Sequence, residues 1–453
     1  MSLSLIFLLE LIIFCYLMQI LVKCFSIISI PGMTFLFLFL THGYYIPFLL
    51  LQSHIDEATP LYLNDTLKYR LFFSLSFMYS FFVLGISIIK YKSKFHVDEI
   101  IQYSNKSITF DYGIYFILII YFTFVILFAL YYSYQTNIFS SLLEYFSAFG
   151  SPQKIKLLRQ ASNPELFGFF GYLFGLCLWI FFPLLSLLSL SISLYRPNIF
   201  FKILAFLAIA INIIFTLSSK SKYPTVHFMA MLLFFFLIWK GKIIFFKNKL
   251  YLLFFVIIIF LISSLFYSMV SSSFKNAMYY VLIRSSEIPN YALMLHFKYF
   301  PDFLAFLHGR DISLLCKLMG WEYVSSPSLL SHLAFGKGGN ANAVFISGLW
   351  VNFGYLGIII GSFLLGIYLQ WIQIWLVRRP KTITRIALFG YLSIQVWVLS
   401  NVSIFQAIFS FGIVTAPIFI RIIEIIIYNM RIVTSKYLSN KSKLKLNTIH
   451  HQI

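Results

Sequence analysis

The chain has 453 residues, of which 60% are hydrophobic, 20% aromatic and only 11% charged. Because an ordinary soluble domain carries about 25% charged residues, a water-soluble fold is excluded for a chain of mean hydropathy +0.89. The net charge of +20 would indicate nucleic-acid binding in a soluble protein, but in a membrane protein Lys and Arg anchor the loops and set the orientation.

Apolar runs separated by polar breaks follow one another along the whole chain, and each bilayer crossing needs about 20 apolar residues. The predicted spans are residues 4–22, 27–51, 70–89, 113–133, 166–192, 199–217, 224–239, 250–270, 344–376, 384–400 and 407–429. The sequence therefore predicts an all-α polytopic membrane protein with about 11 transmembrane helices, in a range of about 10 to 12.

Basic residues gather after alternate predicted spans. They are Lys23, Lys90, Lys92, Lys94, Arg196, Lys240, Lys242, Lys247, Lys249, Arg378, Arg379 and Lys381, followed by those of the tail at 431–453. Because cytoplasmic loops carry an excess of Lys and Arg, these breaks are predicted to be cytoplasmic. The N-terminus is then expected outside and the C-terminus inside.

Four regions follow from this arrangement. Residues 1–270 hold the first spans with a medium outer loop at 134–165, residues 271–343 form one large outer loop, residues 344–430 hold the last spans, and residues 431–453 form a basic cytoplasmic tail. Within the large loop, residues 279–300 and 303–319 are predicted to form amphipathic helices on the outer membrane face. Long loops in a compact protein are usually functional.

The cations in or beside the outer loops form the first candidate site. They are Arg159, Lys220, Lys222, Arg284 and Arg310. A guanidinium can hold a phosphate through two hydrogen bonds and an ammonium adds a mobile point charge, so the set can neutralise a lipid-linked pyrophosphate without a metal. The alternative is that these side chains bind anionic headgroups or extend to the interface, with no chemical role.

A carboxylate and two histidines in the large loop are candidates for acid–base chemistry. Glu287 follows Arg284 by three positions, so on an α-helix the two share a face and can pair. A carboxylate held there can act as general base toward a sugar hydroxyl, and His308 or His332 is the substitute. The alternative is a surface ion pair, worth under about 1 kcal/mol and without chemical role.

The run at 336–342 ends the large loop and is rich in glycine and asparagine. It lacks the spacing of a nucleotide-binding P-loop. Asn342 or Asn340 can instead bond a sugar hydroxyl, and a flexible hinge without ligand contact is the alternative. The sequence contains no zinc, haem, serine-hydrolase or paired-aspartate motif, so neither a metal nor a cofactor is predicted.

The stretch from Asn340 to Gly366 follows the large outer loop that opens with Arg284, and it resembles the O-antigen polymerases of the Wzy-dependent pathway and related oligosaccharide repeat-unit polymerases. Its N-F-G-Y-L-G core at residues 352–357 is the most recognisable part. The resemblance extends, at the level of organisation, to the span count, the basic turn at 218–222 and the position of the long loop.

The resemblance implies a fold similar to the metal-independent, multi-spanning (GT-C type) glycosyltransferases and activity at the periplasmic face of the bacterial inner membrane. It implies that undecaprenyl-pyrophosphate-linked repeat units are donor and acceptor in lipopolysaccharide O-antigen biosynthesis, with undecaprenyl pyrophosphate released. Family members depend on outer-face arginines, which map to Arg284 and Arg159, and Lys220 or Lys222 stands where relatives often carry arginine. A polysaccharide chain-length regulator is the implied partner.

Three other functions stay open. An O-antigen ligase shares the fold and the donor but transfers to lipid A-core. A flippase or other polysaccharide transporter should line a central cavity with its cations, and a proton or ion pathway needs more intramembrane carboxylates than this sequence offers. A membrane-bound sugar acyltransferase needs an Arg and a His at the ends of early helices, a pattern that the sequence lacks.

Overall fold

The computed structural model describes residues 2–51, 64–147, 151, 169–219, 222–244, 257, 261, 274–336 and 339–450. For some of these residues, Lys222 and Arg284 among them, only the backbone is described. All statements below concern this part of the chain.

The described elements are helical, and a single isolated parallel bridge joins Thr109 to Thr382. The first half contains α1 (Leu3–Val22), α2 (Ile30–Leu38), η1 (Phe39–Gly43), α3 (Ile46–Leu51), α4 (Asp65–Lys92), α5 (Asp98–Asn105), α6 (Gly113–Thr136), α7 (Ile138–Ser147), α9 (Phe169–Leu176), η2 (Cys177–Phe181), α10 (Phe182–Tyr195), α11 (Ile199–Ser218) and α12 (Lys222–Trp239). The second half contains α14 (Phe274–Leu282), η4 (Ile283–Glu287), α15 (Ile288–Tyr299), α16 (Ser313–Met319), α17 (Ser326–Phe335), α18 (Ile346–Arg378), α19 (Ile383–Gln395), η5 (Val396–Ser400), α20 (Ile404–Phe409) and α21 (Thr415–His450).

Eight helices in the described part of the chain are long and apolar enough to cross a membrane. They are Leu3–Val22, Ile30–Leu51, Asp65–Lys92, Gly113–Thr136, Phe170–Tyr195, Ile199–Ser218, Ile346–Arg378 and Ile383–Ser400. This confirms a helical multi-pass membrane protein. The count of eleven and the similarity to GT-C glycosyltransferases stay predictions, and the span predicted at 250–270 lies almost entirely outside the described residues.

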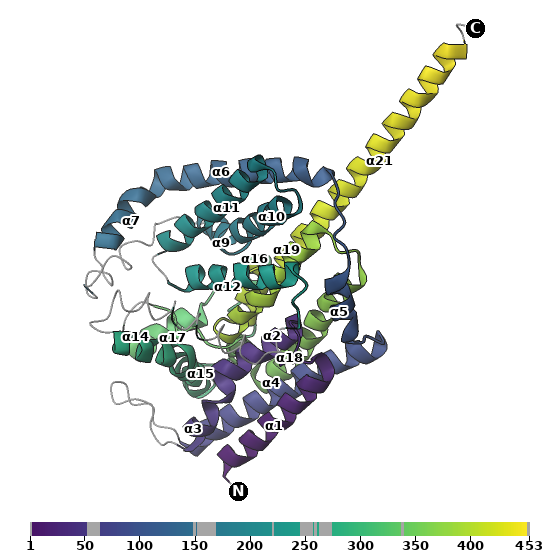
Figure 1. Ribbon diagram of the computed structural model, residues 1–453. Helices are drawn as coiled ribbons and strands as arrows, with labels where there is room; N and C mark the ends of the chain where they lie inside the picture. The colour runs from purple at the N-terminus through teal and green to yellow at the C-terminus, as the bar shows by residue number, and fades with distance from the viewer. Residues whose placement is uncertain are drawn as a thin grey trace.

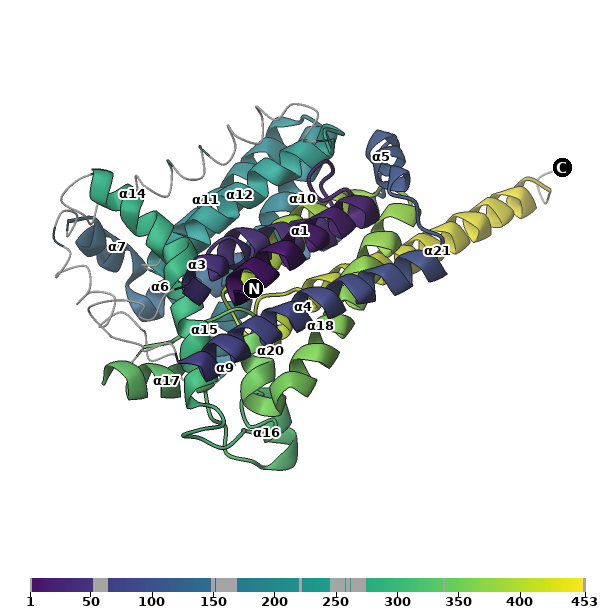
Figure 2. The same ribbon diagram turned by 90° about the horizontal axis from the view of Figure 1, so that it is seen from below.

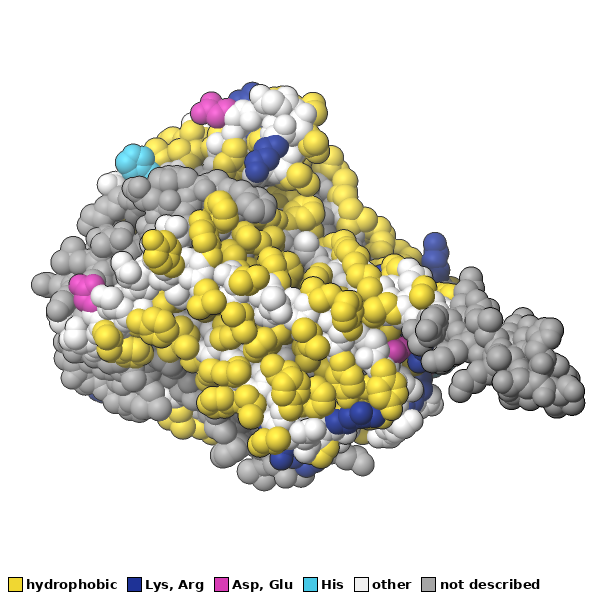
Figure 3. All heavy atoms as spheres, turned by 90° about the horizontal axis from the view of Figure 1, so that it is seen from above, with side chains coloured by type: hydrophobic (Ala, Val, Ile, Leu, Met, Phe, Trp, Pro, Cys, Tyr) yellow, Lys and Arg dark blue, Asp and Glu magenta, His cyan; other side chains and the backbone are white. Residues whose placement is uncertain are grey.

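The bundle presents an apolar surface to its surroundings. On α6, Phe116, Ile119, Leu127 and Leu130 are each more than half exposed. Figure 3 shows hydrophobic side chains across most of the described surface seen from above, with a few Lys and Arg toward its edges. Exposed apolar patches of this extent are rare on soluble proteins, so we assign this face to contact with lipid.

The two ends of the bundle differ in the elements that they carry. In both ribbon views α7, α14, α15 and α17 lie toward one end, while α5 and the far half of α21 lie toward the other (Figures 1 and 2). We call these the α15 end and the α5 end. The described part of the large polar loop lies toward the α15 end, and Lys23 and Arg378, which pair with α5, lie toward the α5 end. Which end faces the cytoplasm stays a prediction.

Two glycines let α4 and α18 pack with their backbones nearly touching. A Cβ atom at Gly85 of α4 would lie against the carbonyl oxygen of Phe363, and one at Gly366 of α18 would lie against the carbonyl oxygen of Phe82. Small residues permit such close approach of membrane helices. By contrast, a Cβ atom at Gly175 of α9 would meet no atom within 4 Å.

We therefore expect a glycine-to-alanine substitution to destabilise the protein at Gly85 but not at Gly175. Gly85→Ala should lower the free energy of unfolding by about 1–3 kcal/mol, because the added methyl group forces α4 away from α18. Gly175→Ala is the matched control and should be neutral or stabilising by up to about 1 kcal/mol, since alanine is the better helix former. Thermal melting in detergent measures both, and equal effects at the two sites would contradict the packing argument.

The large loop differs from its predicted form in two ways. The segment predicted as an interfacial helix at 279–300 is α14, η4 and α15, and α15 is buried within the bundle against α4 and α18 rather than lying on the membrane face. The helix predicted at 303–319 is only the seven-residue α16, because residues 300–312 form turns and extended chain. The sequence did not predict α17, and the span predicted at 407–429 is interrupted between α20 and α21.

Candidate functional site

The entry of the large loop into the bundle is held by a buried polar cluster. The Nδ1 atom of His42 on η1 lies 2.7 Å from Asn290 Oδ1 on α15, and its Nε2 atom lies 3.0 Å from the carbonyl oxygen of Ser400. The Asn290 side-chain amide also donates to the carbonyl oxygen of Thr41 at 2.9 Å. Buried polar groups with partners on several elements specify a single arrangement, so this cluster fixes α15 between η1 and η5.

An ion pair anchors the far end of α15 to α4. Arg70 donates from Nη1 and Nη2 to the two carboxylate oxygens of Asp302 at 2.8 and 2.7 Å, and Nη1 also donates to the carbonyl oxygen of Phe297. The Arg70 guanidinium holds the pKa of the Asp302 carboxyl below its usual value. Arg70 thereby fixes the turn that follows α15, a role that its place at the end of a predicted span did not indicate.

The asparagine of the N-F-G-Y-L-G core holds the turn that precedes α16. Asn352 is fully buried, accepts from the backbone N–H of Gly309 at 2.7 Å and donates to the carbonyl oxygen of Gly348 at 2.7 Å. Beside it, the backbone N–H of Leu307 donates to the carbonyl oxygen of Val351 at 2.8 Å. The turn at 307–309 is thus attached to the start of α18.

A break in α18 makes this attachment possible. Gly354 has φ 60° and ψ −145°, a backbone conformation outside the helical region, which glycine adopts without steric cost. A Cβ atom there would lie 3.3 Å from the ring of Phe306. Trp350 donates from Nε1 to the carbonyl oxygen of Phe300 at 3.1 Å, so the first turns of α18 hold both the end of α15 and the turns after it.

Asp311 connects the turn region to α17. Its carboxylate is buried and accepts from the backbone N–H and the hydroxyl of Ser326, each at 2.9 Å, at the first position of α17. A carboxylate at a helix start satisfies an otherwise unpaired N–H group and faces the positive end of the helix dipole. Burial nevertheless raises the pKa of Asp311 from 3.8 to about 6.

This raised pKa has a measurable consequence. Between 3.8 and about 6 the folded protein binds more protons at Asp311 than the unfolded chain does, so this group's contribution to the free energy of unfolding falls as the pH rises through that window. Asp311→Asn should remove that part of the pH dependence of the melting temperature. Asp311→Ala should cost about 1–2 kcal/mol, because Ser326 loses its acceptor. A wild-type pH profile retained by Asp311→Asn would contradict the assignment.

The predicted site residues differ in how the structure describes them. Arg159 and Lys220 lie outside the described residues, and Lys222 at the start of α12 and Arg284 in η4 are described by backbone alone. Glu287 is half-buried at the end of η4. Residues 283–287 form a π-turn instead of the α-helical turn on which the predicted pairing of Arg284 with Glu287 was based, and that pairing stays a prediction.

The remaining candidates are exposed at the α15 end. Arg310 follows the turn held by Asn352, His332 lies in the last turn of α17, and Asn342 lies in the extended segment before α18. Backbone hydrogen bonds join the segments that carry these residues. The N–H of Val324 donates to the carbonyl oxygen of Arg310, and the N–H of Ala341 donates to that of Pro327, each at 2.9 Å.

The segment that carries Glu287 leads into α15, which lies beside α17. The ring centroids of Tyr291 on α15 and Phe335 on α17 are 6.1 Å apart. These contacts place the segments that bear Arg310, His332, Asn342 and Glu287 around α17, at the same end of the bundle. Among the described residues, no three His, Cys, Asp or Glu side chains gather where they could hold a metal ion.

The polar groups at this end are an exposed guanidinium, an imidazole, an amide and a half-buried carboxylate. Such groups can bind an anion and form hydrogen bonds with hydroxyl groups. The three residues that build it, Asn352, Asp311 and Arg70, were not predicted as site residues. The signal that was available for Asn352 was its place in the N-F-G-Y-L-G core. Comparisons with models of known protein families, with functionally characterised proteins and with solved structures gave no match.

Proposed function

We propose that the chain is an oligosaccharide repeat-unit polymerase of the O-antigen type, a metal-independent glycosyltransferase that uses a lipid-pyrophosphate-linked donor. One observation carries the proposal. Asn352, the first residue of the core on which the resemblance rests, binds the turn immediately before Arg310. The motif thus has a physical task, which is to hold a polar loop in position at the end of the bundle.

In the proposed reaction a hydroxyl oxygen of the acceptor sugar attacks the anomeric carbon of the donor, and the bond from that carbon to the pyrophosphate oxygen breaks. The hydroxyl proton passes to Glu287 or His332, and the electron pair leaves with the lipid pyrophosphate. Arg284 and Arg310 would stabilise the negative charge on the leaving group, together with Arg159, Lys220 and Lys222. Asn342 would bond a sugar hydroxyl.

A sugar pyrophosphate is already activated, so positioning and charge stabilisation supply most of the required rate enhancement. Two lipid-tethered substrates must meet at one end of the bundle, and a rigid scaffold keeps the reacting groups in place. The buried contacts of Asn352, Asp311 and Arg70 provide such a scaffold. In this proposal the α15 end faces the periplasm, the protein lies in the inner membrane, and a chain-length regulator is its protein partner.

The test is the lipopolysaccharide of a strain that lacks the gene, in the bacterium that carries it. Loss of a polymerase leaves core lipid A capped with at most one repeat unit, and complementation restores the ladder. Purified protein in nanodiscs, given undecaprenyl-pyrophosphate-linked repeat units and no added metal, should produce lipid-linked polymer and free undecaprenyl pyrophosphate.

The other functions give different outcomes. Loss of a ligase removes even the single repeat and leaves polymer on the lipid carrier, and loss of a flippase leaves repeat units on the cytoplasmic leaflet. An unchanged ladder in the deletion strain, with no polymer formed by the purified protein, would exclude polymerisation as the function.

A further inference from the structure

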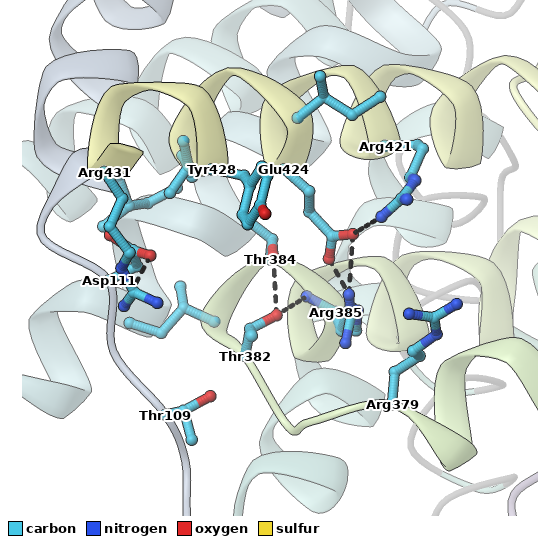
Figure 4. Close-up of a pocket in the computed structure, with 14 residues that line it drawn as sticks. Thr109, Asp111, Arg379, Thr382, Thr384, Arg385, Arg421, Glu424, Tyr428 and Arg431 are labelled. Carbon is cyan, nitrogen blue, oxygen red and sulfur yellow. Dashed lines mark hydrogen bonds and ion pairs between the residues drawn. The ribbon is translucent and has the colours of Figure 1, made fainter. Parts of the chain in front are cut away.

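A cavity of about 370 Å³ lies at the α5 end, opposite the proposed polymerase site. Its walls come from the chain before α6 and the start of that helix, from the start of α19 and from the first half of α21 (Figure 4). Four arginines line it, namely Arg379, Arg385, Arg421 and Arg431, together with the carboxylates of Asp111 and Glu424. The lining groups carry a net charge of +2 at neutral pH.

Two of the arginines are engaged by one carboxylate. Arg385 donates from Nη2 to Glu424 Oε2 at 2.9 Å, and its Nε atom lies 2.7 Å from Oε1, while Arg421 Nη1 donates to Oε2 at 3.1 Å. Arg385 and Glu424 are nearly buried, with side-chain exposures of 8% and 11%. These ion pairs join α19 to α21, which gives Arg385, Arg421 and Glu424 a structural role.

The other two arginines, Arg379 and Arg431, take no part in these ion pairs. Arg431 forms a 3.1 Å ion pair with Asp111, but its side chain is 68% exposed and stays available to a second anion. Arg379 has no ion-pair or hydrogen-bond partner among the described residues, although it lines the same cavity. Such cation excess around a cavity favours binding of an anion, and guanidinium groups favour a phosphate.

Hydroxyl groups and apolar side chains complete the cavity. The hydroxyls of Thr382 and Thr384 lie 2.9 Å apart at the start of α19, and Figure 4 shows both between Arg385 on one side and Asp111 with Arg431 on the other. Ile383, Ile425 and Tyr428 supply apolar lining. A phosphate ester with an attached glycerol fits this mixed lining better than a bare inorganic ion does.

The cavity lies at the level where α21 leaves the apolar zone. Ile418, Ile422 and Ile426 expose 53%, 50% and 44% of their surface on the preceding turns, and the exposed Arg431 follows them. A site at this height is at the membrane–water boundary, where lipid phosphates are concentrated. Basic pockets between membrane helices on the cytoplasmic side are suited to anionic headgroups.

We propose that this cavity binds the phosphate group of a glycerophosphate ester, with Arg379 and Arg431 as the arginines available to it. The ester is either the headgroup of an anionic phospholipid or a soluble glycerol phosphate, which share this chemistry. The site is independent of the proposed polymerase activity, so its test requires no turnover.

Native mass spectrometry of the whole protein in a neutral detergent tests the proposal. Short-chain phosphatidylglycerol, zwitterionic phosphatidylcholine and glycerol phosphate are titrated in separate arms. The wild type should bind phosphatidylglycerol in preference to phosphatidylcholine, and the double variant Arg379→Gln with Arg431→Gln should bind it roughly tenfold more weakly. Arg379→Gln alone should show part of the loss and retain the fold, since that side chain has no described partner.

The matched control removes two charges at the same end but outside the cavity, by Lys92→Gln with Lys106→Gln, both exposed. It should leave phosphatidylglycerol binding within about twofold of the wild type, because charges outside the site are screened. Arginine-dependent binding of phosphatidylglycerol alone identifies a lipid site, and arginine-dependent binding of glycerol phosphate identifies a soluble ester. Binding unaffected by the arginine changes, or equally weakened by the lysine changes, would overturn the proposal.

Discussion

Arg284→Ala is expected to leave the protein in the membrane at normal abundance but to reduce lipopolysaccharide to forms carrying at most one repeat unit. The reason is that one guanidinium aimed at a developing charge contributes about 100- to 1,000-fold in rate. The measurement is the lipopolysaccharide ladder of a deletion strain that carries the variant, with immunoblotting of the membrane fraction to show equal expression.

Two further variants separate phosphate contact from bulk charge. Lys275→Ala removes an exposed cation from α14, close in sequence to Arg284, and should keep the full ladder. Arg284→Lys keeps the charge but loses the planar fork, so we expect a shortened ladder between those of the wild type and the alanine variant. A full ladder with Arg284→Ala would remove this residue from the proposed site without bearing on the function of the chain.

Asn352→Leu should have the largest effect on the scaffold. The change removes two 2.7 Å hydrogen bonds and leaves the N–H of Gly309 and a carbonyl oxygen facing an apolar side chain in a fully buried position. Because a buried unpaired polar group costs about 1–3 kcal/mol, the free energy of unfolding should fall by about 3 kcal/mol. The turn before Arg310 should also become mobile, and polymer length should fall.

Thermal melting in detergent and protection of the Gly309 amide against hydrogen exchange measure these effects. The control is Asn105→Leu, an exposed asparagine at the other end of the bundle, which should change the melting temperature little. Asn352→Asp keeps the acceptor for Gly309 but not the donor to Gly348, so it should retain more of the amide protection than Asn352→Leu. A wild-type ladder and wild-type protection in Asn352→Leu would show that the contact does not hold the loop.

The helical, multi-pass class could be predicted because it depends on local quantities. A run of about 20 apolar residues identifies a span whatever its neighbours are, and the described helices match the predicted spans to within a few residues for α1, α6 and α11. The large loop was predicted less well. Pro301 and Gly309 were available as helix breakers, but the burial of α15 depends on contacts of Asn290 and Trp350 that no local pattern contains.

The candidate site, like the fold, could be predicted only in part. Composition and charge selected Arg310, His332 and Asn342 as exposed polar groups of the large loop, and the structure places their elements together. The pairing of Arg284 with Glu287 was predicted from α-helical spacing, whereas residues 283–287 form a π-turn. Periodicity arguments assume a regular helix, and a single wide turn changes which side chains share a face.

The sequence by itself determined that this chain folds in a membrane, where most spans lie and which polar loop is expected to carry the chemistry. These features follow from hydropathy and charge, which are additive along the chain. Only the tertiary structure decided what holds that loop in place and which arginines gather around a cavity at the opposite end. Asn352 meets Gly309 across 43 positions, Arg70 meets Asp302 across 232, and the arginine cavity joins segments near 110, 380 and 425. Such contacts depend on how helices pack, because the energy of a buried hydrogen bond or ion pair depends on partners that the local sequence does not specify.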